Sequence, residues 1–269
     1  MNNNIYSRNN FQLFMNVENQ KIPTLIFIHG FMGNSKIWKY LFNNLYKYYK
    51  IIIVDLPGHG KSKISSNDVD LTIDNIADDV IKWILIKKYI KKAIFIGHSM
   101  GGYVALSIAK KIPEIFSGLC LLHSTAESDN YQKKKNRINS IKLINKNFEF
   151  FISENVKKWF NPKKINSLKK ELEFTKKIAL STPINVITSL SIGMTKRKNR
   201  ISVLRNTSFP KLYIIGKYDL ILDKNKIYKE INLGYRTSSV EISTGHMAHL
   251  ESPKEITKIL KKFVSICSI

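Results

Sequence analysis

The feature that most constrains this chain is a serine between glycines, directly after an apolar segment. The run 93–96 has the length and composition of a buried strand, and Gly97-His98-Ser99-Met100-Gly101 follows it at once. In a G-x-S-x-G pattern the serine lies at a sharp turn between a strand and a helix, which exposes its hydroxyl beyond the sheet. We expect a strained backbone at Ser99, and Gly97 and Gly101 must lack a Cβ because strand and helix approach closely. Five residues also match by chance, so the assignment depends on partners elsewhere in the chain.

The high positive charge is the most unusual property of the composition. The net charge is +24, and Lys, Ile and Asn together make up 103 of the 269 residues. Codons rich in A and T encode all three residue types, and the lysines are spread through every segment without a recognition motif. We therefore attribute the charge to base composition and a solvated surface, and expect no nucleic acid partner. An acidic protein partner is the remaining alternative.

The location of the protein is also constrained by its sequence. No apolar run approaches the roughly 18 residues of a membrane span, and residues 1–4 lack the basic and apolar regions of a secretion signal. Cys120 and Cys267 are the two cysteines, and they form neither a disulfide framework nor a metal-ligand spacing. We expect a reduced, cytoplasmic protein without membrane attachment, metal or cofactor.

Apolar runs of strand length alternate with segments of helical spacing. This pattern predicts an α/β fold with a mostly parallel sheet covered by helices on both faces. Strand patterns fade between residues 125 and 205, where 19 basic and 6 acidic residues accompany apolar residues spaced by three and four. We therefore expect core segments 1–124 and 206–269, with a helical cap inserted at 125–205. The expected strands include 11–15, 24–28, 51–54, 93–96, 119–122, 211–215 and 238–242, and the expected helices include 35–48, 72–89, 103–111 and one that begins with Ser252-Pro253-Lys254-Glu255.

A serine nucleophile needs a base and a carboxylate that orients the base. Asp219 follows the expected strand 211–215, and His246 follows the last strand. Parallel strands end at the same edge of a sheet, so both side chains are expected beside Ser99. The order Ser99, Asp219, His246 along the chain is the one expected when the serine lies in a G-x-S-x-G turn. Asp223 is the nearest rival carboxylate and His249 the nearest rival base. We favour His246 because Gly245 lets the backbone turn sharply toward the pocket.

Donors for the oxyanion and residues of the substrate pocket can also be placed. The backbone N–H of Met100 lies at a helix N-terminus without an intrahelical partner, and that of Phe31 lies in the loop after a neighbouring strand. Gly30 and Gly33 allow that loop to approach Ser99. We expect His29, Gly30, His98 and His123 at the substrate pocket, with His98 packed beneath the serine turn.

Taken together, these segments resemble the α/β-hydrolase superfamily. The resemblance rests on His29-Gly30-Phe31, residues 55–62 (DLPGHGKS), residues 97–102 (GHSMGG), Gly216 with Asp219, and Gly245-His246. It implies that Ser99 is the nucleophile, Asp219 the acid and His246 the base, with Phe31 and Met100 forming the oxyanion hole and 125–205 the helical cap. A serine at position 99 argues against the dehalogenase and epoxide hydrolase branches, which use aspartate there. Only about 23 residues precede the HGF strand, so the early antiparallel strands must be short.

The leading function is hydrolysis of a small carboxylic ester through an acyl-enzyme. The chain also resembles menaquinone-pathway lyases, which use the same triad and an arginine-lined pocket, for which Arg137 is the candidate. A third possibility is a pimeloyl-carrier-protein methyl ester esterase, in which Lys133-Lys134-Lys135 and Arg137 attract the acidic carrier protein. A non-enzymatic binding module with this fold is disfavoured by the intact triad.

Overall fold

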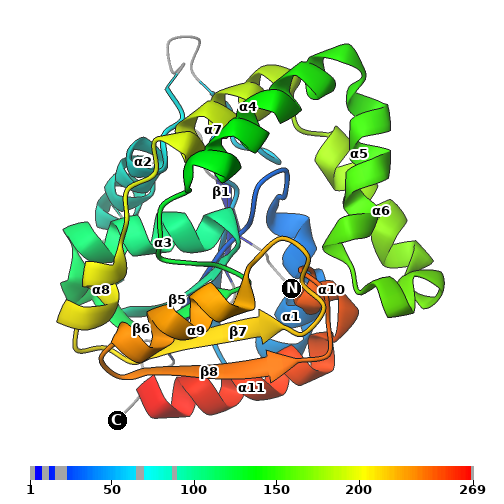
Figure 1. The fold of residues 1–269 in the computed structure, drawn as a ribbon. Helices are drawn as coiled ribbons and strands as arrows, with labels where there is room; N and C mark the ends of the chain where they lie inside the picture. The colour runs from blue at the N-terminus through cyan, green and yellow to red at the C-terminus, as the bar shows by residue number, and fades with distance from the viewer. Residues whose placement is uncertain (1–3, 8–11, 16–22, 65–69, 87–89, 268–269) are drawn as a thin grey trace.

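A single eight-stranded sheet forms the centre of the molecule. The computed structural model describes residues 4–7, 12–15, 23–64, 70–86 and 90–267. The strand order is β1-β2-β4-β3-β5-β6-β7-β8, in which β1, β2 and β4 pair antiparallel and all pairs from β4 to β8 are parallel (Figure 1). The mostly parallel sheet is therefore confirmed. Its strands are β1 (Asn4–Ser7), β2 (Gln12–Met15), β3 (Thr24–Ile28), β4 (Lys50–Val54), β5 (Ala93–His98), β6 (Phe116–Leu122), β7 (Lys211–Gly216) and β8 (Thr237–Ile242).

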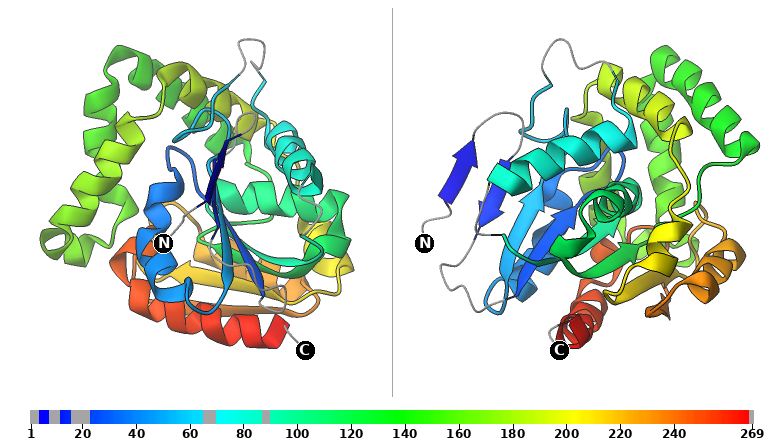
Figure 2. Two further views of the ribbon diagram at one scale, coloured as in Figure 1. Left: turned by 180° about the vertical axis from the view of Figure 1, so that it is seen from behind. Right: turned by 90° about the vertical axis from the view of Figure 1, so that its left-hand side faces the viewer.

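The central strands are buried on both faces, which explains their continuous apolar sequences. Leu25 and Phe27 of β3 belong to a core on one face, whereas Ile26 and Ile28 belong to the core on the other. The first face is covered by η1, α1, α10 and α11, and the second by α2, α3, α8 and α9 (Figure 2). These helices are η1 (Ser35–Trp38), α1 (Lys39–Leu45), α10 (Ala248–Glu251), α11 (Pro253–Cys267), α2 (Ile73–Ile86), α3 (Met100–Lys111), α8 (Ile201–Asn206) and α9 (Lys224–Leu233).

The expected helix boundaries are met at two N-termini. The Thr72 hydroxyl accepts a hydrogen bond from Asn75 N at 3.2 Å, as a cap of α2. The Ser252 hydroxyl donates to the Glu255 carboxylate at 2.9 Å at the start of α11. The helix expected over 35–48 is instead a 3₁₀ turn followed by α1, which ends at Leu45. The end of the helix expected at 89 lies outside the described residues, beyond Ile86.

The segment expected to be a cap is helical, and it arches over one end of the sheet (Figure 1). It has a small core of its own, which includes Ile144, Ile152 and Phe160 and continues to Met32 and Met247 of the sheet loops. The helix α8 packs against α3 and α9 rather than over the sheet edge. The other elements here are α4 (Tyr131–Lys146), α5 (Phe148–Val156), η3 (Lys157–Trp159), η4 (Pro162–Ser167), α6 (Lys169–Leu180) and α7 (Ile184–Thr195), and the turn η2 (Pro113–Ile115) precedes β6.

Among the described helices, none is by itself long and apolar enough to cross a membrane. In the part of the chain that the structure describes, one pair of helices, α6 and α7, satisfies length and composition when taken together, and the two meet at a 93° bend.

Candidate active site

Ser99 lies at the tight turn between β5 and α3. Its backbone has φ 50° and ψ −116°, outside the regions that non-glycine residues favour. The turn is held by bonds from Ser99 N to Leu122 O at 3.0 Å and from Gly102 N to Ser99 O at 2.9 Å. A Cβ at Gly101 would overlap the carbonyl oxygen of Ile28, and one at Gly97 would overlap Gly101 and Gly102. The strained serine and its two obligatory glycines are therefore as expected from the sequence.

Asp219 follows β7, and its side chain is almost completely buried. Its Oδ1 accepts the backbone N–H groups of Ile221 and Leu222 at 2.8 and 3.3 Å, and its Oδ2 faces His246 and His123. Burial alone would raise the pKa of this carboxyl group, but the two histidines hold the pKa of Asp219 far below its usual value. Asp219 is thus an ionised acceptor at neutral pH.

The rival carboxylate has a different role. The Asp223 side chain accepts the backbone N–H groups of Asn225 and Lys226 at 3.0 and 3.5 Å, which makes it the N-cap of α9. Its carboxylate is therefore used at a helix N-terminus.

His246 pairs with Asp219, with 2.8 Å between Nδ1 and Oδ2. Because an ionised carboxylate can only accept, Nδ1 carries the ring proton, and Nε2 of a neutral ring keeps its lone pair. His249 is instead fully buried against Trp38 and His98, and neither of its ring nitrogens has a hydrogen-bond partner among the described residues. Burial lowers the pKa of His249 well below the usual value, so this ring is neutral.

Gly245, next to His246, is required for a reason that differs from the sequence argument. Its backbone is not in the left-handed region that favours glycine. A Cβ at this position would overlap the backbone of Phe160 and Asn161 in the cap. Close approach of the cap, rather than a sharp turn, therefore accounts for this glycine.

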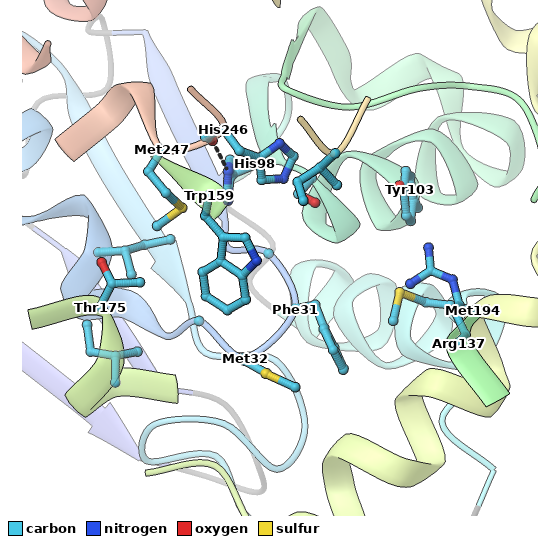
Figure 3. Close-up of a pocket in the computed structure, with 16 residues that line it drawn as sticks. Phe31, Met32, His98, Tyr103, Arg137, Trp159, Thr175, Met194, His246 and Met247 are labelled. Carbon is cyan, nitrogen blue, oxygen red and sulfur yellow. Dashed lines mark hydrogen bonds between the residues drawn. The ribbon is translucent and has the colours of Figure 1, made fainter. Parts of the chain in front are cut away.

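A cavity of about 120 Å³ lies where these loops meet the cap. Figure 3 shows Met247 and Thr175 at one side, Tyr103, Met194 and Arg137 at the other, and Trp159 between them. Gly30 and His98 line the cavity, as expected, and so do Ser99 and His246. The further lining residues are Phe31, Met32, Gly33, Ile37, Ile178 and Ile221.

His29 and His123, the other two histidines expected at the pocket, are not part of this lining. Leu56 N donates to His29 Nε2 at 3.0 Å and the His29 Nδ1 lies 2.8 Å from Gly30 O, so this buried ring connects two loops. Its burial lowers the pKa of His29 to about 4. His123 lies behind Asp219 rather than beside the cavity, with 3.0 Å between Nδ1 and Oδ2.

The two expected oxyanion donors flank the serine. Phe31 lines the cavity, and Met100 is the first residue of α3, whose N–H has no intrahelical acceptor. Neither N–H has a hydrogen-bond partner in the part of the chain that the structure describes. A Cβ built on Gly30 would lie 3.2 Å from Ser99 Cβ, which shows how closely this loop approaches the serine.

One cluster at the pocket was missed by the sequence argument. Arg137 Nε and Arg197 Nη2 donate to the two oxygens of Asp129, at 2.6 and 2.8 Å. The Arg197 guanidinium also lies 3.6 Å from the centre of the Tyr103 ring. The resemblance to the lyases makes Arg137 a candidate for the substrate pocket, but it does not predict the ion pair of Arg137 with Asp129. The scarcity of acidic residues in this lysine-rich segment was the available signal for Asp129.

Asp219 and the two histidines that contact it also satisfy the distance requirement of a metal site. One ligand atom each from His123, Asp219 and His246 lie within 4.8 Å of one another. Both imidazoles already hydrogen-bond to the carboxylate, so hydrogen bonding accounts for this proximity. We assign no metal or cofactor to these residues.

Comparison with known proteins agrees with this geometry. Residues 23–140 match the family model described as alpha/beta hydrolase fold. The pimeloyl-[acyl-carrier protein] methyl ester esterase of Wigglesworthia glossinidia brevipalpis is 31% identical over 89% of this chain and 93% of that protein. A putative 2-succinyl-6-hydroxy-2,4-cyclohexadiene-1-carboxylate synthase of Bacillus subtilis (strain 168) is 24% identical over 90% of each chain. The solved structure of a thermophilic esterase from Thermogutta terrifontis superposes with a TM-score of 0.87, at 23% identity and with 96% and 93% of the two chains covered. The chain therefore belongs to the alpha/beta-hydrolase family and is an esterase-like hydrolase.

Proposed function

We propose that this hydrolase cleaves a small carboxylic ester, with Ser99 as nucleophile, His246 as base and Asp219 as the orienting acid. The observation that carries the proposal is the 2.8 Å contact between His246 Nδ1 and Asp219 Oδ2 beside a cavity that Ser99 and His246 both line. That contact leaves Nε2 of His246 free to accept the serine proton. Asp219, ionised and buried, stabilises the imidazolium that results.

The reaction proceeds in two steps. Ser99 Oγ bonds to the ester carbonyl carbon while its proton passes to His246 Nε2, and the alcohol then leaves with that proton. Water next bonds to the acyl carbon while one of its protons passes to the same nitrogen. The bond from that carbon to Ser99 Oγ then breaks, the acid leaves, and the proton passes from His246 Nε2 to Ser99 Oγ. The N–H groups of Phe31 and Met100 are the proposed oxyanion donors, each worth about 10²–10³ in rate.

The decisive experiment combines a covalent probe with turnover of p-nitrophenyl acetate. We expect a fluorophosphonate to label the wild-type protein at Ser99, and Ser99→Ala to lose both labelling and turnover while keeping its circular dichroism spectrum. Ser265→Ala, at an exposed serine of α11, is the matched control and should keep both. A wild-type protein that neither reacts with the probe nor turns over ester contradicts the proposal.

A methyl ester on a carrier-protein-bound acyl chain is the more specific candidate substrate. It is supported by the 31% identical relative and by the lysines of α4 near Arg137, of which Lys134 and Lys135 are exposed. We expect K134E/K135E to raise KM for the carrier-bound ester about tenfold at low salt without changing KM for a free ester, because charge steers association. K254E/K258E on α11 is the control of equal charge. If KM changes equally for both substrates, or for neither, the proposal that the substrate is bound to a carrier protein is contradicted.

The lyase reaction is kept as an alternative because Arg137 lines the cavity. Arg137 is already paired with Asp129, and the chain has six arginines, which limits a multi-arginine pocket. Pyruvate release from the pathway intermediate, measured with lactate dehydrogenase, would favour the lyase over the esterase.

A further inference from the structure

One carboxylate oxygen of Asp219 forms hydrogen bonds with two imidazole rings. Its Oδ2 lies 2.8 Å from Nδ1 of His246 and 3.0 Å from Nδ1 of His123. His246 reaches the cavity, whereas the His123 side chain is completely buried behind the carboxylate. The proposed reaction uses His246 and Asp219, but His123 has no role in it so far.

The backbone holds His123 in this place. Its φ of 49° is in the left-handed region, where histidine is one of the less disfavoured residues. The His123 N–H donates to Ile214 O at 3.0 Å, and a Cβ on Gly216 would lie 2.7 Å from Cε1 of the ring. A constrained backbone and a glycine under the ring thus direct Nδ1 toward Asp219.

The direction of the His123 hydrogen bond follows from its surroundings. The carboxylate is ionised and can only accept, so Nδ1 of His123 must donate. Burial lowers the pKa of His123, so the ring is neutral, and its Nε2 has no hydrogen-bond partner among the described residues. His123 therefore contributes one neutral N–H donor to the oxygen that also serves His246.

Two further buried histidines lie beside the pair of imidazoles that contact Asp219. The His98 ring lies 5.1 Å from that of His246 and 6.3 Å from that of His123, and burial lowers the pKa of His98 and of His249 well below the usual value. His98 and His249 are therefore neutral spectators. Among the described residues, the charged or titratable groups on the remaining neighbouring elements include Asp219 itself, Tyr103 and Arg137 across the cavity, and Glu251, which accepts Gly245 N at 2.9 Å.

We propose that His123 is a positioning residue that acts through Asp219: its N–H draws charge from Oδ2 and sets the pH at which His246 becomes a free base. With this donor in place, less carboxylate charge stabilises the imidazolium form of His246. The base is thereby deprotonated at lower pH than a triad with an unshared Oδ2 would allow. The inference rests on the proposed function, because His246 is taken as the base.

Two variants at position 123 separate this role from packing. His123→Leu fills the buried space with an apolar side chain but removes the donor, and we expect the acidic limb of the kcat/KM profile to move about 1 pH unit higher. His123→Asn retains an amide N–H near the position of Nδ1 and tolerates positive φ, so it should return the limb to within about half of that shift. His59→Leu removes another fully buried histidine that does not contact Asp219, and should leave the limb in place.

A second readout does not depend on turnover. The ring resonances of His246, followed by NMR during a pH titration, should shift their midpoint upward in His123→Leu and return in His123→Asn. A folded His123→Leu protein whose His246 midpoint and acidic limb equal those of the wild type overturns the proposal. If the protein turns over no ester, the NMR titration still decides whether His123 acts on His246, so failure of the two proposals can be told apart.

Discussion

The backbone N–H of His246 donates to the carbonyl oxygen of Trp159 at 2.7 Å, so the loop with the candidate base is bonded to the cap. Asn161 strengthens this connection, since its side-chain amide donates to Ser243 O at 3.3 Å. Glu251 accepts Gly245 N at 2.9 Å from the core side. The imidazole thus depends on the cap for its position, and a change in the cap can alter the chemistry without touching the triad.

Gly245→Ala tests this dependence. A Cβ at position 245 would overlap the Phe160 and Asn161 backbone, so the cap must move away and the bond from His246 to Trp159 lengthens. We expect kcat to fall about 10²-fold, as for small misplacements of catalytic groups, with KM changing less. Ser243→Ala, two residues earlier and exposed, keeps the backbone contact and serves as the control. An unchanged kcat in a folded Gly245→Ala protein would show that the cap contact does not position the base.

Paired substitutions at Asp219 and Asp223 test which carboxylate is the acid. Asp219→Asn removes the charge that orients His246, and we expect kcat to fall by about 10⁴ with little change in the folded structure. Asp223→Asn retains an N-cap residue and should keep activity within about twofold, with little loss of stability. Esterase assays and thermal unfolding of both variants give the comparison. A greater loss of activity from Asp223→Asn than from Asp219→Asn would reverse the assignment.

The sheet and the loops of the site follow closely from the sequence, because their signals are local. A buried parallel strand such as 24–28 is apolar from Leu25 to Ile28, and His29-Gly30 marks its end. The pairing of Asp219 with His246 was foreseen from strand order, and the structure brings these side chains together.

Contacts between segments far apart in the chain were not foreseeable in this way. His123 was assigned to the pocket because a histidine after a strand faces the sheet edge, but its positive φ turns the ring toward Asp219 instead. The role of Gly245 depends on its contact with Phe160 and Asn161 in the cap. The spacing of apolar residues in the sequence does not predict where this part of the cap lies relative to Gly245. Asp129 and Arg197 are 68 positions apart, and their pairing follows only from how α7 returns to the core.

Asp129 is expected to contribute strongly to stability. Its carboxylate is almost completely buried and accepts from both Arg137 and Arg197, the latter only 5% exposed. Asp129→Asn leaves two guanidinium groups facing each other without their counter-ion, and we expect the free energy of unfolding to fall by about 3–5 kcal/mol in urea. Asp70→Asn removes the partner of Lys196 in an exposed pair, and should cost less than about 1 kcal/mol. Equal losses for the two variants would contradict a buried, coupled cluster.

The buried histidines predict how stability depends on pH. Burial lowers the pKa of His59 to about 3 in the folded protein, whereas the unfolded chain has a value near 6.5. Because the folded value is depressed, this stabilising contribution is complete above about pH 6.5 and is lost as the pH falls toward 3. Between pH 8 and pH 5 the unfolded state binds the extra proton, so His59 alone should lower the free energy of unfolding by about 2 kcal/mol.

Urea unfolding at pH 8 and pH 5 checks this pH dependence. His59→Leu should be less stable than the wild type at pH 8, since the ring contact with His29 is lost, yet lose about 2 kcal/mol less on going to pH 5. If His59→Leu and the wild type lose the same stability between the two pH values, His59 is not held neutral in the folded protein.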